Sequence, residues 1–582
     1  MRYPQLQVLP AERKSIEIFR GCNRNARIGE GEFFHMKNLT SDHFPVLAPR
    51  GRRGFYVKPA SPQGLIAKDD ICYVDGSDFV MGERRIEMGL SVKEEDCPKQ
   101  LVSMGAYVII LPDRKYINTV NPGDRGDIDA EFTATEQVEF RLSTADGGEI
   151  EHVTVSPDAP EAPGNLQYWI DTSAQPNTLK QYSAANEMWV SIATTYVKIQ
   201  SAGIGTHFAV HDGITISGIM AEGVEDLNGA AVVWARGDDY LVVTGIVNTV
   251  ATQAGGVRVA RKMPVMDFVI ESGNRLWGCR YGESNEGETV NEIYASKLGD
   301  FKNWSCYMGI STDSYAASLG SDGEFTGAVT FLGYPMFFKE NCVHKVYGSF
   351  PASFQIQDTA CRGVQRGCGR SLAIVNETLF YKARSGICAF DGSLPVEIGH
   401  ALGSEPRFDA VGGAVGSKYY VSMRDGEDRW QLFVYDTARG LWHMEDDLHA
   451  GAFCASRGEL YCIDAQGQNI ITMRGSGTVD TAPVQWEAET GNLGIATPDM
   501  KYLSRLTLRL WLERGAKLEI YAQYDLSGEW LHCCTVFGTD LRSFTVPLRP
   551  RRCDHFKLKF VGQGDGKLYS MTKTIEGGSD IS

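Results

Sequence analysis

Residues 410–445 read AVGGAVGSKYYVSMRDGEDRWQLFVYDTARGLWHME, and this stretch decides the fold. Short apolar segments alternate in it with turns of Gly, Ser and Asp, so that strand, polar turn and strand follow one another. The same form recurs as GLIAKDDICYVDGSDFVMG at residues 64–82 and as LAIVNETLFYKARSGICAFDG at residues 372–392. Seven such units are counted, at a spacing of roughly 40 residues. This repetition predicts a β-propeller, in which each four-stranded blade buries its faces against its neighbours.

The overall composition agrees with a large, folded, all-β protein. The chain has 582 residues, of which 43% are hydrophobic and 22% charged, and it contains 63 glycines but few long helix-forming runs. No run of about 18 apolar residues occurs, and no apolar segment with a cleavage site follows the N-terminus. We therefore expect a soluble protein made in a cytoplasm, with two to four domains.

The rhythm of strands and turns changes at several points and divides the chain into five parts. Residues 1–61 form a basic lead-in, and residues 62–120 form the first blades. Residues 121–263 break the rhythm and predict an inserted β-rich domain, after which residues 264–480 supply the remaining blades. Longer alternating strands such as KLEIYAQY predict a C-terminal β-sandwich over residues 481–582. The expected fold is thus all-β, with a propeller of about seven blades, within a range of six to eight.

The chain shows no pattern typical of a catalytic or metal site. His207 and His211 have a metal-like spacing only on a helix, whereas on a strand they would stand roughly 13 Å apart. No CxxC pair and no GxSxG motif occurs, and YDLSGEW at residues 524–530 lacks the spacing of a sialidase Asp box. The 14 cysteines are irregularly scattered, which favours reduced, buried thiols. The sequence therefore predicts no enzyme, no metal and no cofactor.

Charge is unevenly placed along the chain. The net charge is −16, yet residues 1–60 hold 11 Lys and Arg against 5 Asp and Glu, a local +6 that leaves −22 for the remainder. An acidic body of this kind argues against wrapping nucleic acid by counterion release. It is compatible with a passage through which DNA slides without sticking.

Four motifs resemble those of a known family. NRLWGCRYG at residues 274–282 and EIYASKLGDFKNW at residues 292–304 are similar to a strand pair of tail tubular protein B and related tail nozzle or packaged-DNA stabilisation proteins of short-tailed bacteriophages. MKNLTSDHFPVLAPRGRRG at residues 36–54 resembles the opening of these proteins, and ITISG at residues 214–218 a strand of their inserted domain. Only the Asn274–Trp304 motif is specific.

The resemblance implies a structural virion protein without catalytic residues. Its subunits would form a ring, commonly a hexamer, at the distal end of the tail, made in the host cytoplasm and contacting the tail adaptor and tail fibre proteins. The ring would hold the packaged genome until ejection, and DNA would pass through its lumen without sequence-specific readout. No membrane insertion by this chain is implied.

Two other functions stay open at this stage, and one site follows from the charge pattern. A receptor- or glycan-binding propeller at a tail tip would show exposed aromatic residues on one propeller face. A propeller glycoside hydrolase would need convergent carboxylates at its axis. Arg50, Arg52 and Arg53 lie in APRGRRG, where Pro and Gly prevent a helix. We expect them to form an assembly contact with an acidic surface of an adjacent subunit or of the tail adaptor.

Overall fold

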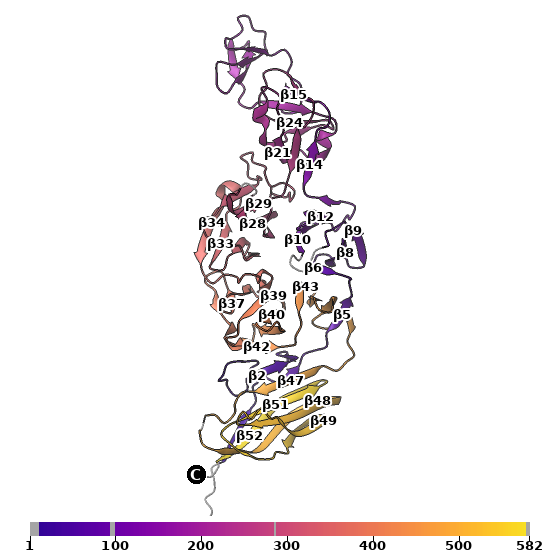
Figure 1. Cartoon of the computed structure of the whole chain (residues 1–582), viewed down its shortest axis with the longest axis vertical. Coiled ribbons are helices and arrows are strands. Elements are labelled where there is room, and N and C mark those ends of the chain that lie inside the picture. The colour runs from indigo at the N-terminus through magenta and orange to yellow at the C-terminus, as the bar shows by residue number, and fades with distance from the viewer. Residues whose placement is uncertain (1–10, 93–98, 285–286, 497, 578–582) are drawn as a thin grey trace, which may run out of the picture.

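The computed structural model describes residues 11–92, 99–284, 287–496 and 498–577. In this part of the chain, strands joined by turns build nearly all the regular structure, and the helical segments are short 3₁₀ turns. Seven antiparallel sheets follow one another along the chain and stand around a common centre (Figure 1). The prediction of an all-β propeller is confirmed. No helix among the described residues is long and apolar enough to cross a membrane.

Six of the seven propeller sheets are meanders of consecutive strands. The first three sheets consist of β6 (Pro62–Ala67), β7 (Ile71–Asp75), β8 (Asp78–Met81), β9 (Arg84–Glu87); β10 (Gln100–Met104), β11 (Tyr107–Leu111), β12 (Lys115–Asn118), β13 (Arg125–Asp127); and β27 (Phe268–Ser272), β28 (Arg275–Glu283), β29 (Thr289–Ala295), β30 (Tyr315–Ser318). The next three consist of β31 (Gly327–Phe331), β32 (Tyr334–Phe338), β33 (Cys342–Tyr347), β34 (Gln355–Ala360); β35 (Ala373–Val375), β36 (Thr378–Lys382), β37 (Ile387–Phe390), β38 (Val396–Glu397); and β39 (Arg407–Val415), β40 (Lys418–Asp425), β41 (Trp430–Asp436), β42 (Leu441–Met444). Three 3₁₀ turns lie between or beside these strands, η3 (Pro351–Ser353), η4 (Gly369–Ser371) and η5 (Gly399–Leu402).

The sixth sheet shows why these residues form strands and turns. Tyr419 and Phe433 are fully buried on neighbouring strands, so the apolar runs are held by packing. The carboxylate of Asp425 accepts hydrogen bonds from two backbone N–H groups of the following turn, and that of Asp436 does the same one turn later. Gly440 closes the second turn at a φ of 68°, a left-handed conformation that suits glycine.

The N-terminal segment closes the propeller ring. The inner strand of the seventh sheet, β43 (Ala450–Ser456), packs against β6 of the first sheet. The seventh sheet continues with β44 (Glu459–Asp464) and β45 (Asn469–Thr472), and β5 (Gly54–Val57) from the lead-in pairs with β45 and with β46 (Thr478–Val479). A side chain at Gly54 would place its Cβ 1.9 Å from the carbonyl oxygen of Ser476, so only glycine fits this closure.

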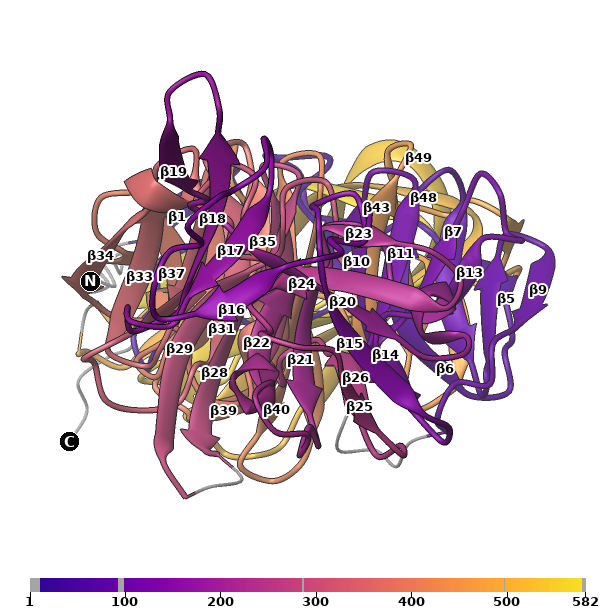
Figure 2. The ribbon, with the colours of Figure 1, turned by 90° about the horizontal axis from the view of Figure 1, so that it is seen from above.

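Residues 130–261 form an inserted domain with its own hydrophobic core. It lies at one end of the molecule, and Figure 2 looks down onto it with the propeller behind. Its three sheets consist of β14 (Ala130–Thr133), β26 (Arg258–Arg261), β21 (Gly213–Ser217), β22 (Gly229–Val232); β23 (Ala235–Arg236), β24 (Tyr240–Thr244), β20 (Tyr196–Gln200), β15 (Val138–Ser143), β25 (Ala251–Gln253); and β16 (Thr154–Ser156), β17 (Tyr168–Asp171), β18 (Thr178–Ser183), β19 (Met188–Ser191), with the 3₁₀ turns η1 (Ile204–His207) and η2 (Glu225–Leu227).

The C-terminal strands and the start of the chain build one further sheet at the other end of the molecule (Figure 1). It contains β1 (Ala11–Ile16), β2 (Phe33–Lys37), β47 (Gln485–Thr490), β48 (Lys501–Tyr524), β49 (Leu531–Val546), β50 (Arg552–Cys553), β51 (Phe556–Gln563) and β52 (Gly566–Gly577). The first half of β48 pairs with β52 and its second half with β51, while β49 follows β48 along both halves. The two halves thus form the two layers of a sandwich, and the short pair β3 (Leu39–Thr40) and β4 (Ala48–Pro49) lies beside it.

Candidate functional site

A cavity of about 1060 Å³ lies between the propeller and the C-terminal sheet. Its propeller wall comes from residues 61–64, 428–431, 444–451 and 465–468. These segments share one face of the propeller, because the turn between the second and third strands of a meander and the link to the next sheet lie on the same side. The opposite wall comes from strands of the C-terminal sheet and includes His35, Lys37 and Glu487.

An aromatic pair forms part of the propeller wall. The rings of Trp430 and His449 are stacked, with centroids 3.7 Å apart and an interplanar angle of 13°. Trp430 is the first residue of β41 and His449 ends the link from β42 to β43, so two separate connections of the same face bring them together. The pair offers a flat aromatic surface at the cavity wall.

Most charged groups of the cavity are already paired. Asp428 bonds to Arg424, and Glu487 lies 2.9 Å from the Lys559 ammonium. The guanidinium of Arg429 has Asp425 and Glu427 at 3.0 and 2.9 Å. A phosphate or a metal ion would therefore have to compete with existing ion pairs.

The uncharged polar groups suit a different ligand. Gln466 and Gln468 are exposed on the turn between β44 and β45, where each amide offers a donor and an acceptor. Burial lowers the pKa of His35 below its usual range, against the opposing effect of Glu487 and Glu489, so its imidazole is neutral at pH 7. Together with the aromatic surface, these groups fit an uncharged ligand rich in hydroxyl groups.

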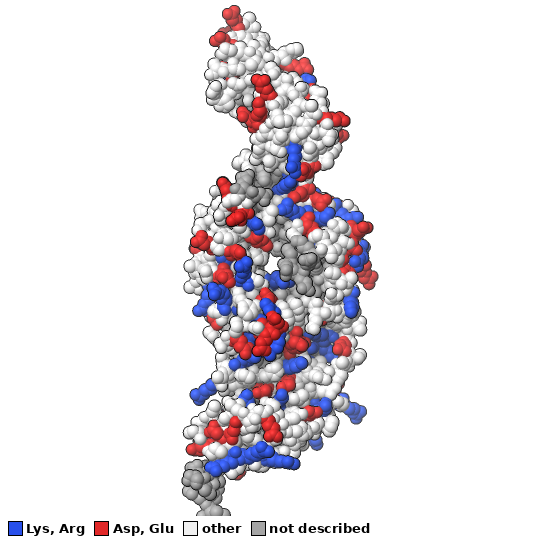
Figure 3. All heavy atoms as spheres, in the orientation of Figure 1, with Lys and Arg blue, Asp and Glu red and all other residues white. Residues whose placement is uncertain are grey.

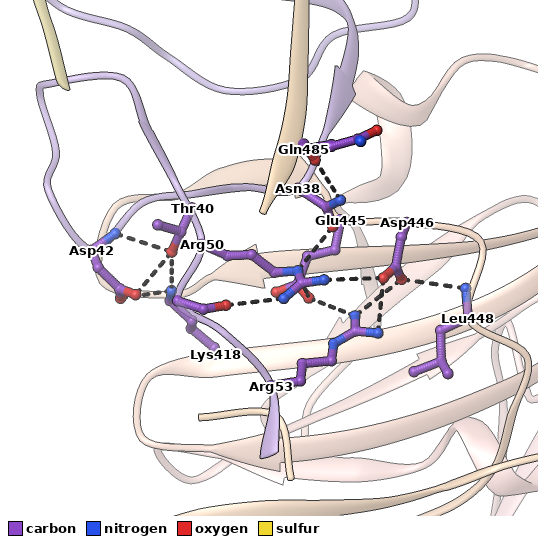
Figure 4. Close-up of polar contacts among 11 residues, drawn as sticks. Asn38, Thr40, Asp42, Arg50, Arg53, Lys418, Glu445, Asp446, Leu448 and Gln485 are labelled. Carbon is purple, nitrogen blue, oxygen red and sulfur yellow. Dashed lines mark hydrogen bonds and ion pairs between the residues drawn. The ribbon is translucent and has the colours of Figure 1, made fainter. Parts of the chain in front are cut away.

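Arg50 and Arg53, two of the three arginines singled out in the sequence, contact Asp446, a residue of the cavity wall (Figure 4). Arg53 reaches Glu445 at 2.9 Å and Asp446 at 2.8 Å, and Arg50 reaches the same two carboxylates at 3.5 and 3.3 Å. Burial alone would raise the pKa of Asp446, but Arg53 and Arg50 hold that pKa below its usual range. The acidic surface that these two arginines meet belongs to the link between β42 and β43 of the same chain.

Arg52 differs from its two neighbours. Its side chain is exposed, whereas those of Arg50 and Arg53 are each 14% exposed. An assembly contact through this cluster remains a prediction, and the structure leaves Arg52 as the residue available for it. Arg50 and Arg53 instead fasten the lead-in to the propeller next to the closing strand β5.

The remaining residues considered in the sequence have structural surroundings. The ring of His207 lies against Phe132, and the ring of His211 against Trp234. The thirteen cysteines in the described ranges are free thiols, eight of them buried, and Cys97 lies outside those ranges.

One hydrogen-bonded trio was not foreseen. The ring of His344 on β33 bonds to Asp358 on β34 and, at 3.0 Å, to the hydroxyl of Ser321 in the link before β31. This order of groups resembles a hydrolase triad. However, the imidazole has no exposed surface, so a leaving group could not take a proton from it. The trio fixes the link before β31 to the fourth sheet of the propeller.

Comparison with known proteins gives a limited result. No family model and no curated protein matches the chain. Among solved structures, an exo-β-1,3-galactanase from Phanerochaete chrysosporium with galactotriose is 8% identical over 52% of this chain and 94% of its own, with a TM-score of 0.22. A sialidase of Trypanosoma rangeli with sialic acid is 9% identical over 98% of this chain and 96% of its own, with a TM-score of 0.26. A family 43 arabinofuranohydrolase from Bacillus subtilis covers 52% and 94% at 9% identity, with a TM-score of 0.19.

These comparisons correct one prediction. The sequence predicted that the protein is not an enzyme, whereas the solved structures that it resembles are glycoside hydrolases and a sialidase. The exclusion of enzymatic activity is therefore withdrawn. Likeness at these scores carries no residue and no reaction over to this chain, so its function has to be argued from its own side chains.

Proposed function

We propose that the protein is a structural subunit of the tail nozzle of a short-tailed phage, which retains the packaged genome and lets it pass on ejection. The observation that supports this best is the position of the Asn274–Trp304 motif, on which the resemblance rests. The motif builds the third propeller sheet directly after the inserted domain. Its polar groups hold these two parts together.

The side chains of the motif have structural tasks. The guanidinium of Arg275 is 2% exposed and donates to the carbonyl oxygens of Ser296 and Ser311, both at 2.8 Å, which fixes the long loop after β29. Trp277 is also 2% exposed and packs between the third and fourth sheets, at 5.0 Å from the ring of Phe354. These contacts hold the third sheet and the loop after β29 in place.

Asn303 joins the inserted domain to the propeller. Its side chain is fully buried, accepts a hydrogen bond from Gly213 N–H at 3.0 Å and donates one to the His211 carbonyl oxygen at 2.7 Å. Next to it, the buried pair of Asp212 and Arg261 ties the domain's base together. The inserted domain is thus fixed on the propeller, as a subunit of a stiff conduit requires.

Assembly is the property that tests this proposal. Purified protein, alone and mixed with the adaptor protein of a short-tailed phage, is measured by mass photometry. We expect closed oligomers, with six copies as the leading number. A protein that remains monomeric with the adaptor present would contradict the nozzle proposal.

A receptor- or glycan-binding propeller at a tail tip is the second candidate. The cavity favours it, because its stacked Trp430 and His449 and its exposed glutamines suit a sugar chain better than a charged ligand. Binding to an array of neutral and acidic glycans tests it, with Trp430→Ala as the site variant. Trp189→Ala, which removes a Trp from the distant β19, is the matched control. Equal binding by the two variants would speak against a sugar site in this cavity.

A further inference from the structure

Charge is separated along the long axis of the molecule. The inserted domain, residues 121–263, has 8 Lys and Arg against 19 Asp and Glu, a net −11. Residues 11–49 and 481–577, which supply the C-terminal sheet at the other end, together have 19 Lys and Arg against 16 Asp and Glu, a net +3. Figure 3 shows Lys and Arg gathered in a band across this sheet. An acidic protein thus has one basic end.

The basic band has a defined origin in the strand register. In the half of the sheet with the order β1, β52, β48 and β49, Thr574 pairs with Arg13 on one side and Arg505 on the other. Arg509 pairs with Ser570, and Lys567 pairs with Trp511. Paired residues point to the same side of a sheet. The outer face, as we call it, therefore carries four cations: Arg13, Arg505, Arg509 and Lys567.

The cations of the outer face are not neutralised. None of the four has a carboxylate within ion-pair distance among the described residues, and Arg13, Arg505 and Arg509 are exposed. By contrast, exposed arginines of the propeller such as Arg85 and Arg429 are paired with Asp. One acid, Glu576, lies at the end of the outer face, beside Ala11.

Between the cations, the outer face is covered with hydroxyl groups. Ser15 and Thr572 are hydrogen-bonded across β1 and β52 at 2.7 Å, and Thr507 and Thr545 face each other across β48 and β49 at 3.5 Å. The other hydroxyl residues in these rows are Ser543, Ser570 and Thr574. Such a surface offers many hydrogen-bond donors, and the ring of Trp511 beside Lys567 adds apolar area to it.

We infer that the outer face contacts the phosphate backbone of the packaged DNA. The inference rests on the nozzle proposal, because it needs DNA to pass the subunit. Arg, Lys, Ser and Thr side chains are the usual phosphate contacts, and DNA interfaces are more polar and more basic than protein interfaces. Four cations give weak contact that needs no particular base sequence, which suits DNA that is held and then released.

The salt dependence of DNA binding measures this contact. Affinity of the purified full-length protein for a fluorescent DNA duplex is determined by anisotropy at several salt concentrations. Each neutralised phosphate contributes a slope of about −0.9 to log K against log salt, so four cations predict about −3.6 per subunit bound. The variant Arg505→Ser with Arg509→Ser should lose about half of this slope. The control Arg85→Ser with Arg362→Ser removes two exposed but paired arginines and should leave the slope unchanged.

The outcomes separate this inference from the nozzle proposal. The inference would be overturned if the unaltered protein showed no salt-dependent binding, or if the Arg505 and Arg509 variant kept the same slope. Neither result would affect the nozzle proposal, which ring formation tests separately. Loss of docking to the adaptor with unchanged DNA binding would also overturn it, since the face would then bind an acidic protein. A reduced slope in a protein that forms no ring would support the DNA contact and contradict the nozzle.

Discussion

Replacing Arg53 by methionine tests how the propeller ring is closed. Arg53 precedes the closing strand β5 and pairs with Glu445 and Asp446, whose side chains are 7% and 14% exposed. Methionine fills a similar volume but leaves both carboxylates with Arg50 alone, at 3.5 and 3.3 Å. Removing one partner of a buried ion pair costs about 3–5 kcal/mol. Because Arg50 remains, we expect the lower end, about 3 kcal/mol.

The assay has to report on the propeller and not on the whole chain, since a protein of several parts does not unfold in one step. Calorimetry should show the propeller transition lowered by roughly 6–12 °C, from about 2–4 °C for each kcal/mol in a large domain. Hydrogen exchange should rise first in β5, which directly follows Arg53, and in β45, which pairs with β5. Arg52→Met, at the exposed neighbouring position, is the matched control and should change neither.

The stability of Arg53→Met at different salt concentrations shows whether the reasoning is wrong. A buried pair is weakly screened, so the loss in Arg53→Met should persist at high salt. A loss below about 1 kcal/mol, or one that vanishes in salt, would show that the pair behaves like a surface contact. The account of ring closure by the lead-in would then be wrong.

Three further predictions concern the core. Trp277→Ala should destabilise the propeller by about 3–5 kcal/mol in calorimetry, because it opens a cavity between two sheets, and native stability would show that Trp277 does not pack there. Burial lowers the pKa of the His443 imidazole to about 3 in the folded protein. The unfolded chain binds a proton at this residue at a higher pH, so the free energy of unfolding should fall by about 1.4 kcal/mol per pH unit as the pH drops from about 6 to 4. The variant His443→Gln should lose this part of the slope. Reducing agent should leave the melting temperature unchanged, since the described cysteines are free thiols, and a marked drop would reveal a disulfide.

The sequence predicted the propeller because its signal is local. Each strand and turn of residues 410–445 is determined by residues adjacent in the sequence. Asp425 and Asp436, for example, stabilise their turns by accepting hydrogen bonds from backbone N–H groups two residues later. The inserted domain was predicted in the same way, because the repeat of strands and turns is interrupted over residues 121–263. Local patterns of this kind require no knowledge of what else packs nearby.

Pairs between strands that lie far apart in the sequence could not be predicted from such local patterns. Phe55 pairs with Ile471, and no feature of either segment indicates the other. For the same reason the charge pattern assigned the acidic partners of Arg50 and Arg53 to an adjacent subunit or the tail adaptor, although carboxylates nearly 400 residues later in the same chain pair with them. The cavity is likewise assembled from segments far apart in the sequence, and Trp430 carries no local sign that His449 stacks on it.

Cryo-electron microscopy of the purified protein with its tail adaptor tests the central claim most directly. The account predicts a closed ring of subunits around a channel wide enough for duplex DNA, with the outer face of Arg505 and Arg509 turned toward the channel. A ring with this face turned outward would retain the nozzle and remove the DNA contact. Single subunits or open chains without a channel would contradict the proposed function itself.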